Sequence, residues 1–207
     1  MKKILSIIFS SVFLMTSAYA GGMIGIKAGM GTLDGERTID ADHGLASGSV
    51  DHEYGAIFAE FEVTDMISVG VEYIPLQATI DTKSTTAADS HATIENHKTI
   101  YALVPMLDTP LYIKAGYSHA DATVTANYTT TTITSAPDAV EGPMIGLGGQ
   151  FESPIPYLDV VRVEATYTDY GKMTINSTST GSGEADNDTR SGEAEQITVT
   201  IGVAKSF

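Results

Sequence analysis

The sequence predicts an all-β fold, a closed eight-stranded antiparallel up-and-down transmembrane β-barrel. Three observations lead to it: short segments of alternating character, a strict alternation of long and short connections, and the pattern of the last eleven residues, Ile197–Phe207. Successive side chains of a strand point to opposite sides. In Ile197–Phe207 this places Ile and Val on one face and small or polar residues on the other. Such a strand suits a sheet with lipid on one side and a polar interior on the other.

The chain begins with the pattern of a secretory signal peptide. A basic pair after Met1 is followed by an uncharged apolar run, Ile4 to Met15, and by the small-x-small cleavage site Ala18-Tyr19-Ala20. The run is shorter than the roughly 20 apolar residues that a membrane-spanning helix needs. We therefore expect cleavage after Ala20, with residues 1–20 as the signal peptide and residues 21–207 as one barrel domain.

Composition excludes several classes of site. The 207 residues contain no cysteine, 26 acidic residues and 11 Lys or Arg, for a formal net charge of −15. A chain without cysteine has no disulfide, thiolate metal site or thiol nucleophile. An acidic chain without a basic stripe is not expected to bind nucleic acid.

Eight segments have the alternation and length of membrane-crossing strands. A tilted strand needs about 9–11 residues to cross a bilayer. The predicted strands are Met23–Leu33, His52–Val63, Ile67–Asp81, Lys98–Met106, Leu111–Ala126, Val140–Glu152, Val160–Asn176 and Gln196–Phe207.

The connections between these strands alternate between long and short. The long ones are Asp34–Asp51, Thr82–His97, Asn127–Ala139 and Ser177–Glu195. The short ones are Thr64-Asp65, Leu107–Pro110 and Ser153–Asp159. Outer-membrane barrels have long loops outside the cell and short turns in the periplasm. This order therefore predicts four acidic extracellular loops and places the N- and C-termini on the periplasmic side.

The alternation assigns apolar residues to the lipid face and small or polar residues to the interior. The facing of Lys98–Met106 stays open, because both of its faces are apolar. Six charged residues fall on the inner face: Lys27, Glu60, Glu72, Lys114, Arg162 and Glu164. An isolated buried charge is costly, so we expect these balanced charges to form one connected network. Eight strands leave an interior that side chains just fill, so the network should stabilise the barrel rather than conduct.

Four segments carry a resemblance to a known family: the signal ending Ala18–Ala20, the strand Gly25–Gly29, the strand Arg162–Tyr167 and the end of the chain, Ile197–Phe207. In these the chain resembles small eight-stranded bacterial outer-membrane barrels of the OmpA-transmembrane, OmpX and opacity-protein type. The resemblance implies the outer membrane of a Gram-negative cell. It also implies contact with outer-membrane lipid and lipopolysaccharide, periplasmic chaperones and the barrel-assembly machinery.

The last strand would carry the assembly signal of that family. Its members here are Val199, Ile201, Val203 and Phe207. Lys205 departs from the pattern, since such barrels usually place Tyr or another apolar residue there. Near the end of the strand its long side chain could reach the headgroups.

Residue types for catalysis and metal binding occur without the spacing that either needs. Ser118-His119-Ala120-Asp121 offers the groups of a hydrolase triad, but Ser118 and His119 point to opposite faces of a strand. Asp186-Asn187-Asp188 could bind Ca²⁺, although it lacks the EF-hand pattern. The histidines could form a surface metal site; we interpret all five as solvated in or beside the long loops. They are His43, His52, His91, His97 and His119.

These observations favour an integral outer-membrane barrel that is not an enzyme and uses no cofactor or metal. Its expected role is structural, in envelope integrity, or surface interaction with an unknown ligand through the acidic loops. One alternative is a small porin-like pore for solutes, which the narrow lumen disfavours. Another is a lipid-modifying enzyme, which lacks catalytic geometry. A soluble ligand-binding barrel like a lipocalin would need the opposite facing, with an apolar interior.

Overall fold

The computed structural model describes residues 21–38, 45–75, 78–83, 89–127, 131–179 and 186–207. The predicted signal peptide, residues 1–20, lies outside these ranges, so its cleavage stays a prediction. Within the described ranges, no helix has the length and apolar character required to cross a membrane.

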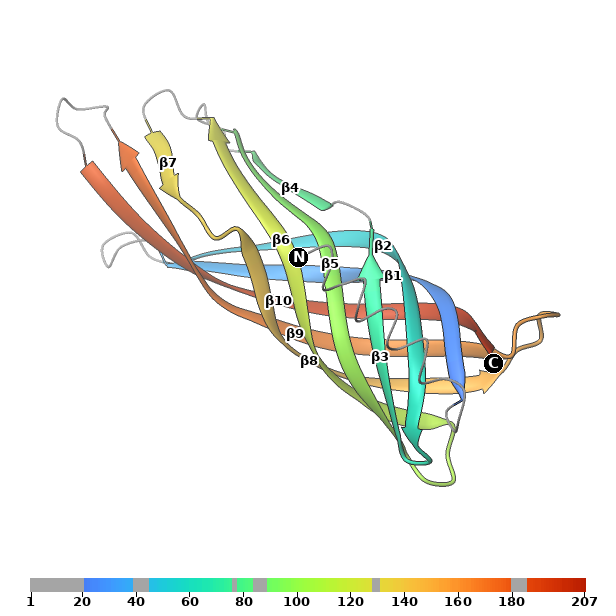
Figure 1. The fold of residues 1–207 in the computed structure, drawn as a ribbon. Helices are drawn as coiled ribbons and strands as arrows, with labels where there is room; N and C mark the ends of the chain where they lie inside the picture. Colours follow the sequence, from blue (N-terminus) through green and yellow to red (C-terminus); the bar gives the residue numbers. More distant parts are fainter. Residues whose placement is uncertain (1–20, 39–44, 76–77, 84–88, 128–130, 180–185) are drawn as a thin grey trace, which may run out of the picture.

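The described chain forms one antiparallel sheet that closes on itself (Figure 1). Its strands are β1 Gly22–Thr38, β2 Leu45–Thr64, β3 Ile67–Ile74, β4 Ala78–Lys83, β5 Asp89–Pro105, β6 Leu111–Asn127, β7 Thr131–Ser135, β8 Ala139–Glu152, β9 Val160–Ser179 and β10 Asp186–Ser206. β10 pairs with β9 on one side and with β1 on the other, which closes the barrel. The predicted closed up-and-down barrel is confirmed.

The barrel has eight strand positions because two of them are interrupted near proline. β3 and β4 both pair with β5, and Pro75 directly follows β3. In the same way β7 and β8 both pair with β9, with Pro137 between them. Proline has no backbone N–H to donate to a ladder. The prediction of one continuous strand over Ile67–Asp81 was therefore wrong, whereas the number of crossings was right.

An apolar band surrounds the part of the barrel nearest the short turns. Its exposed side chains, on all eight strand positions, include Ile24, Ile26, Met30, Ile57, Val63, Val69, Val71, Ile100, Val104, Ile113, Tyr117, Ile145, Leu147, Val163, Val199 and Ile201. We call this set the lipid-facing band. It also resolves the facing of β5: Ile100 and Val104 point outward, while Tyr101 and Leu103 are buried inside.

The strands continue well beyond this band, so the predicted long loops were too long. β5 begins at Asp89 rather than Lys98, and β10 begins at Asp186 rather than Gln196. In this projecting section the two faces exchange character. Ala120, Val140, Tyr170 and Ala194 form a buried apolar cluster inside, whereas Glu95, Glu193 and Glu195 are exposed outside. An apolar core under a charged surface is what a barrel needs where water replaces lipid.

The short-turn rim holds the end of the last strand. Asp159 accepts hydrogen bonds from Lys205 Nζ at 2.9 Å and from the Ser206 N–H at 2.8 Å. The hydrogen bond from Lys205, followed by that from Ser206, lowers the pKa of Asp159 below its usual value. Lys205, which departs from the family pattern, therefore has a partner. The Phe207 ring lies edge-on to Phe61, with 6.5 Å between the ring centroids.

A buried charge network as the candidate functional site

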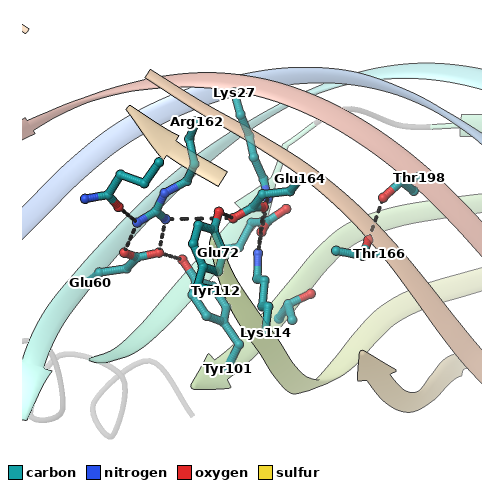
Figure 2. Close-up of polar contacts among 12 residues, drawn as sticks. Lys27, Glu60, Glu72, Tyr101, Tyr112, Lys114, Arg162, Glu164, Thr166 and Thr198 are labelled. Atoms are coloured by element: carbon teal, nitrogen blue, oxygen red, sulfur yellow. Dashed lines mark hydrogen bonds and ion pairs between the residues drawn. The ribbon is translucent and has the colours of Figure 1, made fainter. Parts of the chain in front are cut away.

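The six charged side chains predicted for the interior lie together inside the barrel (Figure 2). They come from β1, β2, β3, β6 and β9, because the two-residue period of each strand turns them all to the same side. All six are buried, and Lys114 is only 1% exposed.

Two lysines and two glutamates form the centre of the network. Lys27 Nζ lies 2.5 Å from Glu72 Oε2 and 2.7 Å from Glu164 Oε2. Lys114 Nζ lies 3.0 Å from each of the same two oxygens. Each ammonium group therefore bridges both carboxylates, and the four charges cancel. These contacts connect β1, β3, β6 and β9 across the lumen.

A second group lies nearer the short turns and is centred on Arg162. Its guanidinium forms a forked ion pair with Glu60, in which Nη1 donates to Oε1 and Nη2 donates to Oε2 at 2.7 Å. Nη2 also donates to Gln150 Oε1 at 2.8 Å. Arg162 Nη1 is 3.8 Å from Glu164 Oε1, so this pair joins the central four charges. Arg matches a carboxylate in this bidentate manner better than Lys does.

Two tyrosines complete the network, and sequence analysis missed both. Tyr101 donates to Glu60 Oε1 at 2.7 Å, and Tyr112 donates to Glu164 Oε1 at 2.6 Å. The rings also face cations: Lys114 Nζ is 4.0 Å from the Tyr101 centroid, and Arg162 Cζ is 5.1 Å from that of Tyr112. The alternation along each strand was the available signal. It was ambiguous for Tyr101, in a strand that is apolar on both faces.

The two tyrosine rings fit only because glycine lies opposite each of them. In the strand register Gly70 faces Tyr101 and Gly148 faces Tyr112. A Cβ on Gly70 would come within 2.5 Å of the Tyr101 ring, and a Cβ on Gly148 would overlap the Tyr112 ring. A narrow barrel can therefore hold inward aromatic rings only beside positions without a side chain.

Replacing Gly148 with alanine should lower the free energy of unfolding by about 1–3 kcal/mol, because the added Cβ would overlap the Tyr112 ring and force it away from Glu164. Urea unfolding in lipid vesicles, followed by heat-modifiable gel mobility, measures this change. Gly55→Ala is the matched control, since a Cβ there would meet its nearest atom at 3.9 Å. Equal effects at both glycines would contradict the steric argument.

The network separates two cavities. A cavity of about 410 Å³ opens at the short-turn rim and ends at Glu60, Arg162 and Tyr112. A much smaller one, about 20 Å³, lies on the other side, beside Lys27, Glu72 and Lys114. The charged side chains and their tyrosine partners fill the lumen between the two.

The comparisons with known proteins agree with this architecture. No protein-family model and no curated protein matches the sequence. Among solved structures, the outer membrane protein OprG from Pseudomonas aeruginosa is similar over 90% of this chain and 96% of its own, with a TM-score of 0.63 and 13% identity. The outer membrane protein AlkL, solved in lipid bilayers, is similar over 93% of each chain, with a TM-score of 0.58 and 10% identity. The fold is that of the small eight-stranded outer-membrane barrels.

In this outer-membrane barrel fold, a layer of four side chains lies on the long-loop side of the charge network, away from the short turns. The Tyr170 hydroxyl donates to Gln196 Oε1 at 2.8 Å and lies 3.1 Å from His97 Nε2. Gln196 Nε2 lies 2.8 Å from His52 Nε2. We call His52, His97, Tyr170 and Gln196 the histidine layer. The interpretation of all five histidines as solvated loop residues was wrong for His52 and His97, because the strands extend past them and turn them inward.

The barrel separates the residues considered for catalysis. Ser118 faces the lumen, where its hydroxyl is 2.9 Å from that of Thr99. His119 faces outward, 3.3 Å from Glu141 and 3.6 Å from Asp121. Among the described residues, no group of three or more His, Asp or Glu side chains is arranged to hold a metal ion. His43 and the side chains of His91 and of the suggested Ca²⁺ segment, 186–188, lie outside that description.

Proposed function

We propose that the chain is a non-enzymatic integral outer-membrane protein with a structural role in envelope integrity or a role in surface interaction. The closed charge network carries this proposal. A neutral set of six ion-paired side chains fills the lumen, which suits a rigid support better than a channel. The termini would face the periplasm, on the side of the short turns. Its partners would be outer-membrane lipid and lipopolysaccharide, and, during assembly, periplasmic chaperones and the barrel-assembly machinery.

The projecting section supports the surface role. Its outward carboxylates, among them Glu95, Glu193 and Glu195, are exposed beyond the lipid-facing band. A surface with an excess of one charge sign attracts ligands of the opposite sign and repels like ones. A cationic partner at the outer surface is therefore the expected ligand class for this role.

Planar-bilayer recording tests the proposal of a closed lumen. The wild-type protein should show no steady conductance at neutral pH. Glu53→Ala is the control, because Glu53 is exposed outside the lumen. A steady wild-type conductance that disappears in Glu72→Ala or Lys114→Ala, but persists in Glu53→Ala, would show that the network lines a pore and would overturn the proposal.

A second candidate function is the uptake of small apolar molecules. Two observations favour it. The interior of the projecting section is apolar, with Leu33, Ile94, Ala122 and Met173 packed against its buried cluster. Within the described ranges, the residues of β2 that precede Ile57 pair only with β1, and β4 pairs only with β5. No ladder therefore joins the described residues of β2 to those of β4 in this section of the wall. An apolar molecule that entered this section would be blocked below by the charge network and would have to leave sideways.

Radiolabelled decane distinguishes the two roles. Uptake should bind decane to protein-containing nanodiscs in excess of empty nanodiscs of the same lipid. Ile94→Ser should reduce this excess, whereas the control Ile24→Ser, on the lipid-facing band, should leave it unchanged. No excess in the wild-type protein would reject uptake and leave the structural or surface role.

A further inference from the structure

The histidine layer joins two parts of the barrel wall that do not pair directly. His52 lies on β2, on the long-loop side of Ile57. The pairing of β2 with β3 ends at Ile57. His97 lies on β5 opposite Ile74, where β3 ends and the interruption begins. Gln196 and Tyr170 complete the connection from His52 to His97 through β10 and β9. These contacts cross the lumen at the level where the described residues of β2 and β4 form no ladder.

The hydrogen bonds of this layer require at least one neutral imidazole. Gln196 Nε2 is an amide donor, so its contact with His52 Nε2 needs an acceptor on the ring. The Tyr170 hydroxyl donates to Gln196, so at His97 its oxygen accepts from the Nε2–H. A protonated histidine has two N–H donors and no acceptor. Protonating His52 therefore removes the bond to Gln196. Turning the Gln196 amide restores that bond only if Tyr170 then donates to a neutral His97 Nε2, so protonating both rings leaves the layer without an acceptor for Tyr170.

We propose that the histidine layer is a proton-sensitive connection that holds β2 to the β5–β4 side at neutral pH and releases it in acid. Two imidazolium groups in one lumen would also repel each other. The release would widen the interruption between β2 and β4 while the charge network below stays closed. This inference concerns the barrel wall and stands for either function proposed above.

Among the described residues, the carboxylate of Asp51 lies near His52, but it is exposed and only partly offsets the effect of burial on that ring. Glu72 from β3 is bound by Lys27 from β1 and Lys114 from β6. The remaining titratable neighbours are Asp51 and Tyr54 on β2, Tyr170 on β9 and the outward-facing His119 on β6. β8 contributes the apolar Met144, and β10 the uncharged Gln196 and Thr198.

The burial of the two rings also favours their neutral forms. Both lie beyond the lipid-facing band, beside the exposed residues Glu53 and Lys98. Burial lowers the pKa of His97 from 6.5 to about 4, and burial also lowers that of His52. A depressed histidine pKa favours the neutral form in the folded state. Its cost to stability therefore appears as the pH falls below 6.5 and is complete below about 4.

Distance measurements between paired spin labels test the proposal. The chain has no cysteine, so labels attach only where cysteine is introduced. Glu53→Cys and Glu95→Cys place labels on the exposed faces of β2 and β5 beside the histidine layer. Lowering the pH from neutral to below the pKa of His97 should shift the label distances to longer values in lipid nanodiscs. An unchanged distribution would overturn the proposal.

Two controls connect the shift to the layer. Labels at Val63→Cys and Val104→Cys, on the same two strands nearer the short turns, should show no shift.

The His52→Gln/His97→Gln variant keeps side chains that hydrogen-bond but do not titrate, so it should lose the shift, whereas His119→Gln should keep it. A shift that persists in the double variant would overturn the proposal. If that variant fails to fold, nitrogen NMR of the wild-type protein measures the pH at which the two imidazoles become protonated. A protonation pH that differs from the pH of the label-distance shift would contradict the proposal.

Discussion

Replacing Glu164 with alanine is expected to lower the free energy of unfolding by about 3–5 kcal/mol, the range for breaking a buried ion pair from one side. Glu164 accepts from Lys27 at 2.7 Å, from Lys114 at 3.0 Å and from Tyr112 at 2.6 Å. Its removal leaves two buried ammonium groups with one carboxylate between them. The excess positive charge, rather than the loss of any single hydrogen bond, accounts for most of the expected effect.

Urea unfolding in lipid vesicles, with heat-modifiable gel mobility to follow the barrel, measures this loss. Asp159→Ala is the matched control, because it also removes a carboxylate from a lysine, but at the exposed rim. Exposed ion pairs contribute little, so this control should change stability only slightly. If Glu164→Ala proved no more destabilising than Asp159→Ala, the network would not stabilise the barrel.

Replacing Ile26 with arginine should destabilise the folded barrel in a bilayer by about 2–4 kcal/mol, the cost of an arginine on the lipid face near the membrane midplane. Ile26 is 61% exposed and pairs with Ile57 and Val203, so it lies within the lipid-facing band. In water the same substitution would place a charge on an exposed surface, where it is tolerated. The size of the effect therefore reports which solvent surrounds this face.

The comparison of Ile26→Arg with Glu53→Arg makes this test specific. Both positions face outward, but Glu53 is already a charged residue at the long-loop edge of the band, where it pairs with Met30. Glu53→Arg should leave the unfolding free energy in vesicles nearly unchanged. Equal tolerance of arginine at both positions would mean that lipid does not surround Ile26, and the assignment of the membrane-facing surface would fail.

The sequence was sufficient for the membrane-crossing part of the barrel because one rule holds along every strand there. Apolar residues point to lipid and small or charged residues point inward, so Lys27 and Arg162 could be placed without coordinates. The rule failed where both faces of a strand are apolar, as at Tyr101, and where the solvent changes from lipid to water. At Glu95 a charged side chain points outward, so this part of β5 resembled a polar loop.

The histidine layer illustrates the second failure. His52 and His97 lie in segments that are polar by composition, which favoured a solvated loop. Their burial depends on strand pairing that begins only after β5 and β10 extend past the lipid-facing band. No local pattern records that pairing, because the partners, Tyr170 for His97 and Gln196 for His52, lie on strands distant in the sequence.

The sequence by itself determined the closed barrel with eight crossings, its lipid-facing surface and the membership of the six-charge network. These follow from side-chain alternation, which is a local property of the strand. Only the tertiary structure decided which charges pair, that Tyr101 and Tyr112 complete the network, and that the barrel projects beyond the membrane with an apolar interior. These features depend on cross-strand register and on distances across the lumen, and both are set only when the last strand closes against the first.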